Sequence, residues 1–122
     1  MLYAAEKYGA AAAGCTLSRQ QFEYATSLVH RRGLDGRVQV FERDYRDLRG
    51  RYDRIASIGM FEHVGRRRLR AYLEKVYSLL ASDGLFLNHG IMRPQTISEN
   101  PASVFWRRNV FPGAELVHCR TS

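Results

Sequence analysis

The chain has little of what marks a secreted, membrane-spanning or metal-binding protein. Its 122 residues include two cysteines, Cys15 and Cys119, three prolines and one tryptophan. Two widely separated cysteines make neither a disulfide framework nor a zinc motif, so no metal site is expected. No apolar run approaches the roughly 20 residues of a membrane helix, and Met1–Tyr8 lacks the order of a signal peptide. We therefore expect a cytoplasmic protein.

Lysine is scarce as well, since Lys7 and Lys75 are the only lysines among 19 basic residues and the others are arginine. The formal net charge of +7 favours anionic partners, namely nucleic acid, a phospholipid surface or a phosphate-bearing carrier. Most arginines are dispersed, which is typical of a solvated surface, and the one local run is Arg66–Arg68 followed by Arg70. Few aromatic residues interleave with this run and no familiar nucleic-acid motif is present, so no nucleic-acid partner is expected.

What the chain does have is a regular alternation of helix and strand patterns. Helices are predicted over Leu2–Tyr8, from Ser18 to Gly33 and from Leu69 to Asp83–Gly84, and strands over Ala10–Leu17, Val38–Phe41, Ile55–Gly59 and Leu85–His89. The continuously apolar first strand is expected to be buried on both faces. Short links between alternating elements indicate right-handed crossovers and a mostly parallel sheet in a single α/β domain over residues 1–122.

Weaker patterns fill the remaining parts of the chain. Ser18 with Gln21 forms a predicted capping box at the start of the second helix. A polar loop is predicted over Asp44–Arg51, and after Pro94 the patterns indicate a loop over Thr96–Ala102, a helical turn over Val104–Arg108 and a tight turn over Phe111–Gly113.

Ligands of open parallel sheets bind outside the carboxyl ends of the strands, and two candidate positions follow the first two strands. Thr16, Leu17 and Ser18 with Gln21 offer hydroxyls and an amide suited to a ribose, although Ser18 and Gln21 also fit a plain helix cap. Asp44–Arg46 places an aromatic ring beside an acid, a pair able to cover an adenine and accept from its amino group. The alternative for this second position is a solvated turn.

Two further candidates follow the third and fourth strands. Glu62 comes directly after a buried strand, where an acid is costly unless it is partnered or used, and it could accept a proton with His63 orienting it. The alternative is an acid that answers the dipole of the helix beginning near Arg66. His89 ends the fourth strand and alone fits a structural histidine. We expect Thr16, Tyr45, Glu62 and His89 to gather along one edge of the sheet.

At these positions the sequence resembles the cyclopropane fatty acid synthase and mycolic acid cyclopropane synthase family. The stretches that carry the resemblance are Gly14–Ser18 with Gln21, Asp44–Leu48, Tyr52–Gly65 with its segment Glu62–Gly65, and Phe111–Gly113. The resemblance implies a Rossmann-like class I methyltransferase fold that binds S-adenosylmethionine. Thr16, Leu17, Ser18 and Gln21 would contact the ribose and methionine, and Asp44, Tyr45 and Arg46 the adenine.

The resemblance also implies a reaction and a site for it. Family members transfer the methyl group to the cis double bond of an unsaturated fatty-acyl phospholipid and remove a proton to close a cyclopropane ring. A bicarbonate ion serves as base, and Glu62, His89 and the backbone of Ile91 match the positions that hold it. A peripheral location at the inner membrane face would follow from the phospholipid acyl-chain substrate.

The sequence departs from the family in several places. Asn88 and Gly90 stand where family members usually have leucine and threonine. The family's first strand and glycine-rich turn would precede Met1, and much of its C-terminal part would follow Ser122. We therefore expect an incomplete sheet and impaired catalysis by the isolated chain. The alternatives are a methyltransferase acting on carbon, nitrogen or oxygen of another small molecule, a non-catalytic basic module, and a gene fragment.

Overall fold

The computed structural model describes residues 1–94, 104–105, 108–109 and 117–119. Strands and helices alternate along the chain as predicted, and the fold is α/β. The chain divides into two compact units, Met1–Arg49 and Gly50–Ser122, and each has its own parallel strand pair. The predicted parallel pairing is therefore confirmed within each unit.

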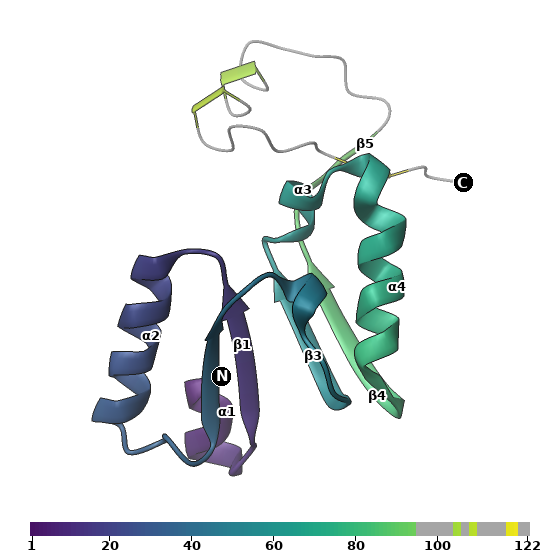
Figure 1. Cartoon of the computed structure of the whole chain (residues 1–122). Helices are drawn as coiled ribbons and strands as arrows, with labels where there is room; N and C mark the ends of the chain where they lie inside the picture. Colours follow the sequence, from purple (N-terminus) through teal and green to yellow (C-terminus); the bar gives the residue numbers. More distant parts are fainter. Residues whose placement is uncertain (95–103, 106–107, 110–116, 120–122) are drawn as a thin grey trace. The chain divides into compact units, whose positions relative to one another are not determined.

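The first unit contains two helices and two parallel strands. In chain order these are α1 (Leu2–Tyr8), β1 (Ala12–Thr16), α2 (Arg19–Arg31), β2 (Val38–Glu42) and the 3₁₀ turn η1 (Tyr45–Asp47). Helix α1 ends at Gly9 with φ 65°, a left-handed conformation that favours glycine. Ala5, Val29, Leu34 and Val38 form the buried core, and α2 lies along both strands (Figure 1).

Strand β1 differs from its prediction in length and burial. It begins at Ala12, and its residues are half-buried or exposed, so the expectation of burial on both faces is wrong for this unit. The side chains of Ala12–Thr16 are small, so each buries little apolar surface. Burial, reinforced by the neighbouring Asp44 carboxylate, nevertheless raises the pKa of the Cys15 thiol, which disfavours the reactive thiolate.

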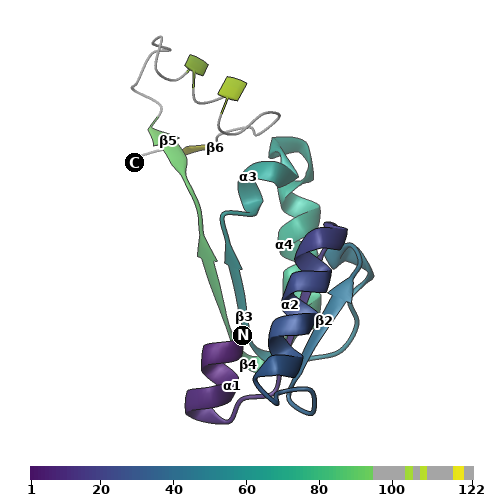
Figure 2. The same cartoon turned by 90° about the vertical axis from the view of Figure 1, so that its left-hand side faces the viewer.

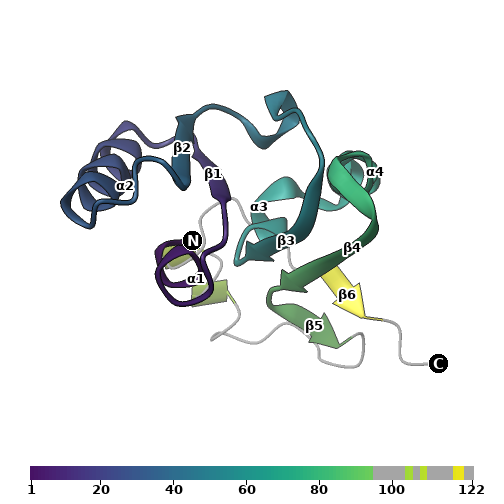
Figure 3. The same cartoon turned by 90° about the horizontal axis from the view of Figure 1, so that it is seen from below.

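The second unit is built around a longer parallel pair. Its elements are β3 (Tyr52–Ile58), α3 (Phe61–Val64), the 3₁₀ turn η2 (Arg66–Arg68), α4 (Leu69–Leu79), β4 (Leu80–His89), β5 (Met92–Pro94) and β6 (Val117–Cys119). Ile58 is opposite His89, and the Gly59 N–H donates to the His89 carbonyl over 2.9 Å. Helix α4 lies on one side of β3 and β4 and buries Tyr72, Val76 and Leu79 (Figures 1 and 3).

The α4 to β4 junction corrects the predicted end of the helix. Helix α4 ends at Leu79, and Asp83–Gly84 lies inside β4. Pairing passes from Tyr52 with Leu80 to Arg54 with Leu85, so β4 holds extra residues in an irregular register. A Cβ atom on Gly84 would lie 3.0 Å from the Ala81 carbonyl oxygen, which explains the glycine.

Beyond β4 the chain continues into β5 in the same general direction, as Figure 2 shows, and β5 pairs in parallel with β6. Val104 and Phe105 are helical, in agreement with the turn predicted there. Two other predictions lie outside the described residues, namely the loop over Thr96–Ala102 and the turn over Phe111–Gly113. Within the described part of the chain, no helix has the length and apolar character needed to cross a membrane.

Candidate functional site

The turn from β1 into α2 forms a closed set of hydrogen bonds. The Ser18 hydroxyl accepts from the Gln21 N–H at 3.3 Å and caps α2, as the capping prediction requires. In a capping box the Gln21 side chain would accept from the Ser18 N–H, but here Thr16 Oγ1 accepts that bond at 3.1 Å. The same hydroxyl donates to Gln21 Oε1 at 2.7 Å. Leu17 is exposed, at 75% of its surface. All four predicted residues are thus brought together at the carboxyl end of β1.

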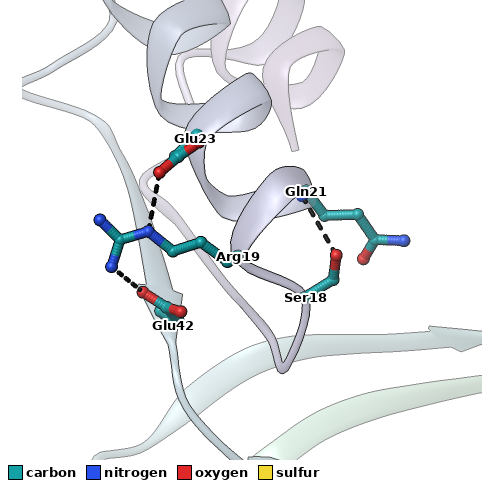
Figure 4. A network of polar contacts seen from close by, with 5 residues as sticks. All are labelled: Ser18, Arg19, Gln21, Glu23 and Glu42. Carbon is teal, nitrogen blue, oxygen red and sulfur yellow. Dashed lines mark hydrogen bonds and ion pairs between the residues drawn. The ribbon is translucent and has the colours of Figure 1, made fainter.

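An ion-pair network fixes the first turn of α2 to β2 beside this set. Figure 4 shows the Arg19 guanidinium between two carboxylates, with Nε 2.7 Å from Glu23 Oε1 and Nη1 3.1 Å from Glu42 Oε2. Glu42 ends β2 and pairs in register with Thr16 at the end of β1. Arg19 therefore ties the start of α2 to the same strand ends, a role that spacing alone did not reveal.

Asp44 and Arg46 form a local charge pair just after β2. Asp44 Oδ1 accepts from the Arg46 N–H at 2.9 Å and from Nε at 3.0 Å, and Oδ2 accepts from Nη2 at 2.7 Å. These bonds hold the pKa of the Asp44 carboxyl below its usual range and raise that of the Arg46 guanidinium. Tyr45, between them, is half-buried in η1. The loop predicted over Asp44–Arg51 thus begins with a 3₁₀ turn over Tyr45–Asp47, which Asp44 caps.

Glu62 is the most buried charged residue among those described, with 3% of its surface exposed. It lies in the one-turn helix α3, directly beyond the carboxyl end of β3. Glu62 Oε1 accepts from the Ile91 N–H at 2.7 Å, whereas Oε2 is buried with no hydrogen-bond partner among the described residues. The structure therefore joins two of the three predicted catalytic residues.

His89 ends β4 at the same end of the unit, and its side chain is exposed. Next to it, Gly90 has no room for a side chain. A Cβ atom there would overlap the buried ring of Phe61 and lie 2.8 Å from Glu62 Oε1. The Ile91 N–H reaches Glu62 across this close contact. Gly90 thus permits the short distance between α3 and the residues after β4.

A polar group beneath α4 was missed by sequence reasoning. The Tyr72 side chain is 1% exposed and its hydroxyl donates to Asn88 Oδ1 at 3.4 Å, while its ring meets Phe86 edge-on. Ser57 pairs in register with Asn88, and its buried Oγ has no hydrogen-bond partner in the described part of the chain. The available signal was Asn88 itself, a polar residue where the resemblance to the family leads one to expect leucine.

Comparison with known proteins relates the chain to a family. The sequence profile of mycolic acid cyclopropane synthetase matches residues 1–121. A probable fatty acid methyltransferase of Pseudomonas putida is 39% identical over 122 residues, which are 95% of this chain and 31% of that protein. The cyclopropane-fatty-acyl-phospholipid synthase of Escherichia coli K12 is 39% identical over 94 residues, 77% of this chain and 24% of that protein.

The fold comparison agrees with the sequence comparison. The crystal structure of a mycolic acid cyclopropane synthase complexed with SAH and CTAB superposes with a TM-score of 0.82 at 32% identity, covering 97% of this chain and 45% of that one. The chain thus spans less than half the length of each of these relatives. The expected α/β methyltransferase fold is confirmed, and the chain belongs to the mycolic acid cyclopropane synthetase family.

Proposed function

We propose that the chain carries the cofactor-contacting and proton-handling residues of an S-adenosylmethionine-dependent methyltransferase. Its acceptor is the cis double bond of an unsaturated fatty-acyl phospholipid, and its product is a cyclopropane ring. The observation that carries the proposal is Glu62, a buried carboxylate with one oxygen fixed by Ile91 and the other without a partner among described residues. Names of relatives that act on fatty acids and on fatty-acyl phospholipids support the substrate class.

The first unit provides donors and acceptors that fit the cofactor. The Thr16 hydroxyl and Gln21 amide already hydrogen-bond each other, and ribose hydroxyls would bind by exchanging with that bond. Asp44 Oδ2 accepts one bond from Arg46 and keeps a second lone pair for an adenine amino group. Tyr45 would supply the ring face, and Leu17 an exposed apolar side chain. Ser18, which caps α2, would hold the turn in shape.

The second unit provides the groups that handle the proton. An alkene is a weak nucleophile, so its methylation creates a carbocation that needs a nearby anion. When bound, S-adenosylmethionine supplies the methyl group and a bicarbonate ion supplies the proton acceptor. Glu62 Oε2 and His89 would hold that ion, because an unpartnered buried carboxylate oxygen can share a proton with it. The Ile91 N–H is already committed to Glu62 Oε1, so Ile91 would act through Glu62.

Transfer of a labelled methyl group tests the proposal directly. The chain is incubated with labelled S-adenosylmethionine and vesicles of cis-unsaturated phosphatidylglycerol, and the lipids are analysed by mass spectrometry. We expect a gain of one methylene unit per modified acyl chain. Vesicles with fully saturated chains are the matched control, since they offer no double bond.

Three results would count against the proposal. Label in a saturated lipid would show that the double bond is not the acceptor. Label in small amines or alcohols would favour a methyltransferase acting on nitrogen or oxygen. Failure to transfer label, together with no heat of binding for S-adenosylmethionine in calorimetry, would show that the chain lacks the activity.

A further inference from the structure

The start of α4 carries the densest positive charge of the sequence. Residues 63–73 contain four arginines and no aspartate or glutamate. Arg67 and Arg68 are exposed in η2, directly after the α3 segment that holds Glu62. Arg70 is exposed in the first turn of α4 and pairs with Glu74 one turn later at 2.8 Å. The cluster therefore lies at the end of the unit where β3 and β4 terminate (Figure 1).

This placement opposes the local electrostatics of the helix. Cations are stabilising near a helix C-terminus and unfavourable near its N-terminus. Helix α2 follows the rule, with His30 and Arg31 in its last turn. Helix α4 has arginines before and within its first turn and no acid there. Local conflicts of this kind are expected where a surface serves a purpose other than stability.

Apolar side chains extend the charged surface along the outside of α4. Tyr72, Val76 and Leu79 face the strands, whereas Leu73 and Tyr77, one turn apart, are 44% and 80% exposed. A surface that combines basic residues with exposed leucine and tyrosine is typical of helices that lie at a membrane interface. We name this surface the α4 basic face, and it comprises Arg66, Arg67, Arg68, Arg70, Leu73 and Tyr77.

We propose that the α4 basic face docks on the headgroups of an anionic phospholipid bilayer. Arginine forms bidentate bonds to phosphate, and the leucine and tyrosine would enter the interface beside the headgroups. The choice of phospholipid over other polyanions rests on the proposed function, since the acceptor is then a lipid in a bilayer. Docking here would bring the end of β3, with Glu62, toward the membrane surface.

Vesicle co-sedimentation without cofactor tests the proposal on the full chain. We expect binding to vesicles that contain phosphatidylglycerol, weak binding to phosphatidylcholine, and release at about 1 M salt, where screening acts within about 3 Å. The variant R67Q/R68Q should bind about 25-fold more weakly, from about 5-fold per basic residue near an anionic surface. R31Q/R37Q, which removes the same charge from exposed positions in the first unit, should bind as the wild type does.

The outcomes separate docking from general charge attraction. Equal losses in both double variants would overturn the proposal, and so would an absence of binding to anionic vesicles by a chain shown folded by circular dichroism. L73S/Y77S should weaken binding at constant charge, and no change would refute the apolar contribution. Equal binding to duplex DNA, lost in R67Q/R68Q, would assign the face to nucleic acid. Methyl transfer to lipid in detergent micelles tests the proposed function independently of docking.

Discussion

Replacing Glu62 by glutamine should separate the functional role of the carboxylate from any structural one. The amide oxygen can keep the bond from the Ile91 N–H, now 2.7 Å long, but without the help of a full charge. That loss costs about 1 kcal/mol, the difference between charge-assisted and neutral hydrogen bonds. The same substitution removes the buried carboxylate, whose Oε2 has no hydrogen-bond partner among the described residues. Removing it should stabilise the folded chain by about 1 kcal/mol or more.

The two contributions should nearly cancel, so the free energy of unfolding of E62Q should lie within about 1 kcal/mol of the wild type. Urea unfolding followed by far-ultraviolet circular dichroism measures this difference. Glu74→Gln is the matched control, because Glu74 is an exposed partner of Arg70 and its change should be within about 0.5 kcal/mol.

Methyl transfer should respond quite differently from stability. Loss of a positioned proton-handling group costs about 100-fold or more in rate, so the transfer supported by the wild-type chain should fall by that factor in E62Q. A loss of more than about 2 kcal/mol of stability in E62Q would show that the charge itself holds α3 to the residues after β4. Unchanged transfer in E62Q would equally refute the reasoning.

Further predictions concern the strand ends. Asp44→Asn should destabilise the chain at neutral pH, because the lowered folded-state pKa of Asp44 adds stability that is fully present above its unfolded value near 3.8. That stability is lost as pH falls through the folded-state pKa, so the thermal midpoints of variant and wild type should converge in acid, and a constant gap would contradict this. Gly90→Ala should cost about 1–3 kcal/mol by urea unfolding, because its Cβ would overlap the Phe61 ring, and an unaffected midpoint would show that the ring moves freely. Tyr72→Phe should lower the free energy of unfolding by about 0.5–1.5 kcal/mol, because it removes the hydrogen bond to Asn88. A double-mutant cycle with Asn88→Leu should show that the two substitutions are not additive.

The parts of the fold that the sequence predicted are those set by local patterns. Alternating strand and helix segments required parallel pairing, and parallel pairing places strand ends together, so the positions of Thr16 and of Glu62 with His89 followed. The Ser18 cap followed from its position before α2. The end of α4 did not follow, because the Asp83–Gly84 turn signal is the same for a helix end and for an irregular strand.

The hydrogen-bond partners of the site residues could not be predicted from the sequence, for a different reason. The bond from Ile91 to Glu62 depends on the backbone after β4 passing close to α3, which no spacing in the sequence encodes. The Asp44 pair with Arg46 is local, but it depends on side-chain rotamers that the sequence does not specify. The contact of Asp44 with adenine stays a prediction.

The two departures from the family pattern on either side of His89 have a common structural explanation. Asn88 accepts from Tyr72, and Gly90 makes room for Phe61, and these two aromatic residues are the largest fully buried side chains in the described part of the chain. Each departure is thus matched to a buried ring that would otherwise lose a hydrogen bond or clash. Restoring leucine or threonine at one of these positions alone would disturb a ring that also packs against the strand end. The segment that carries His89 is therefore bordered by the hydrogen bond to Tyr72 on one side and by close packing against Phe61 on the other.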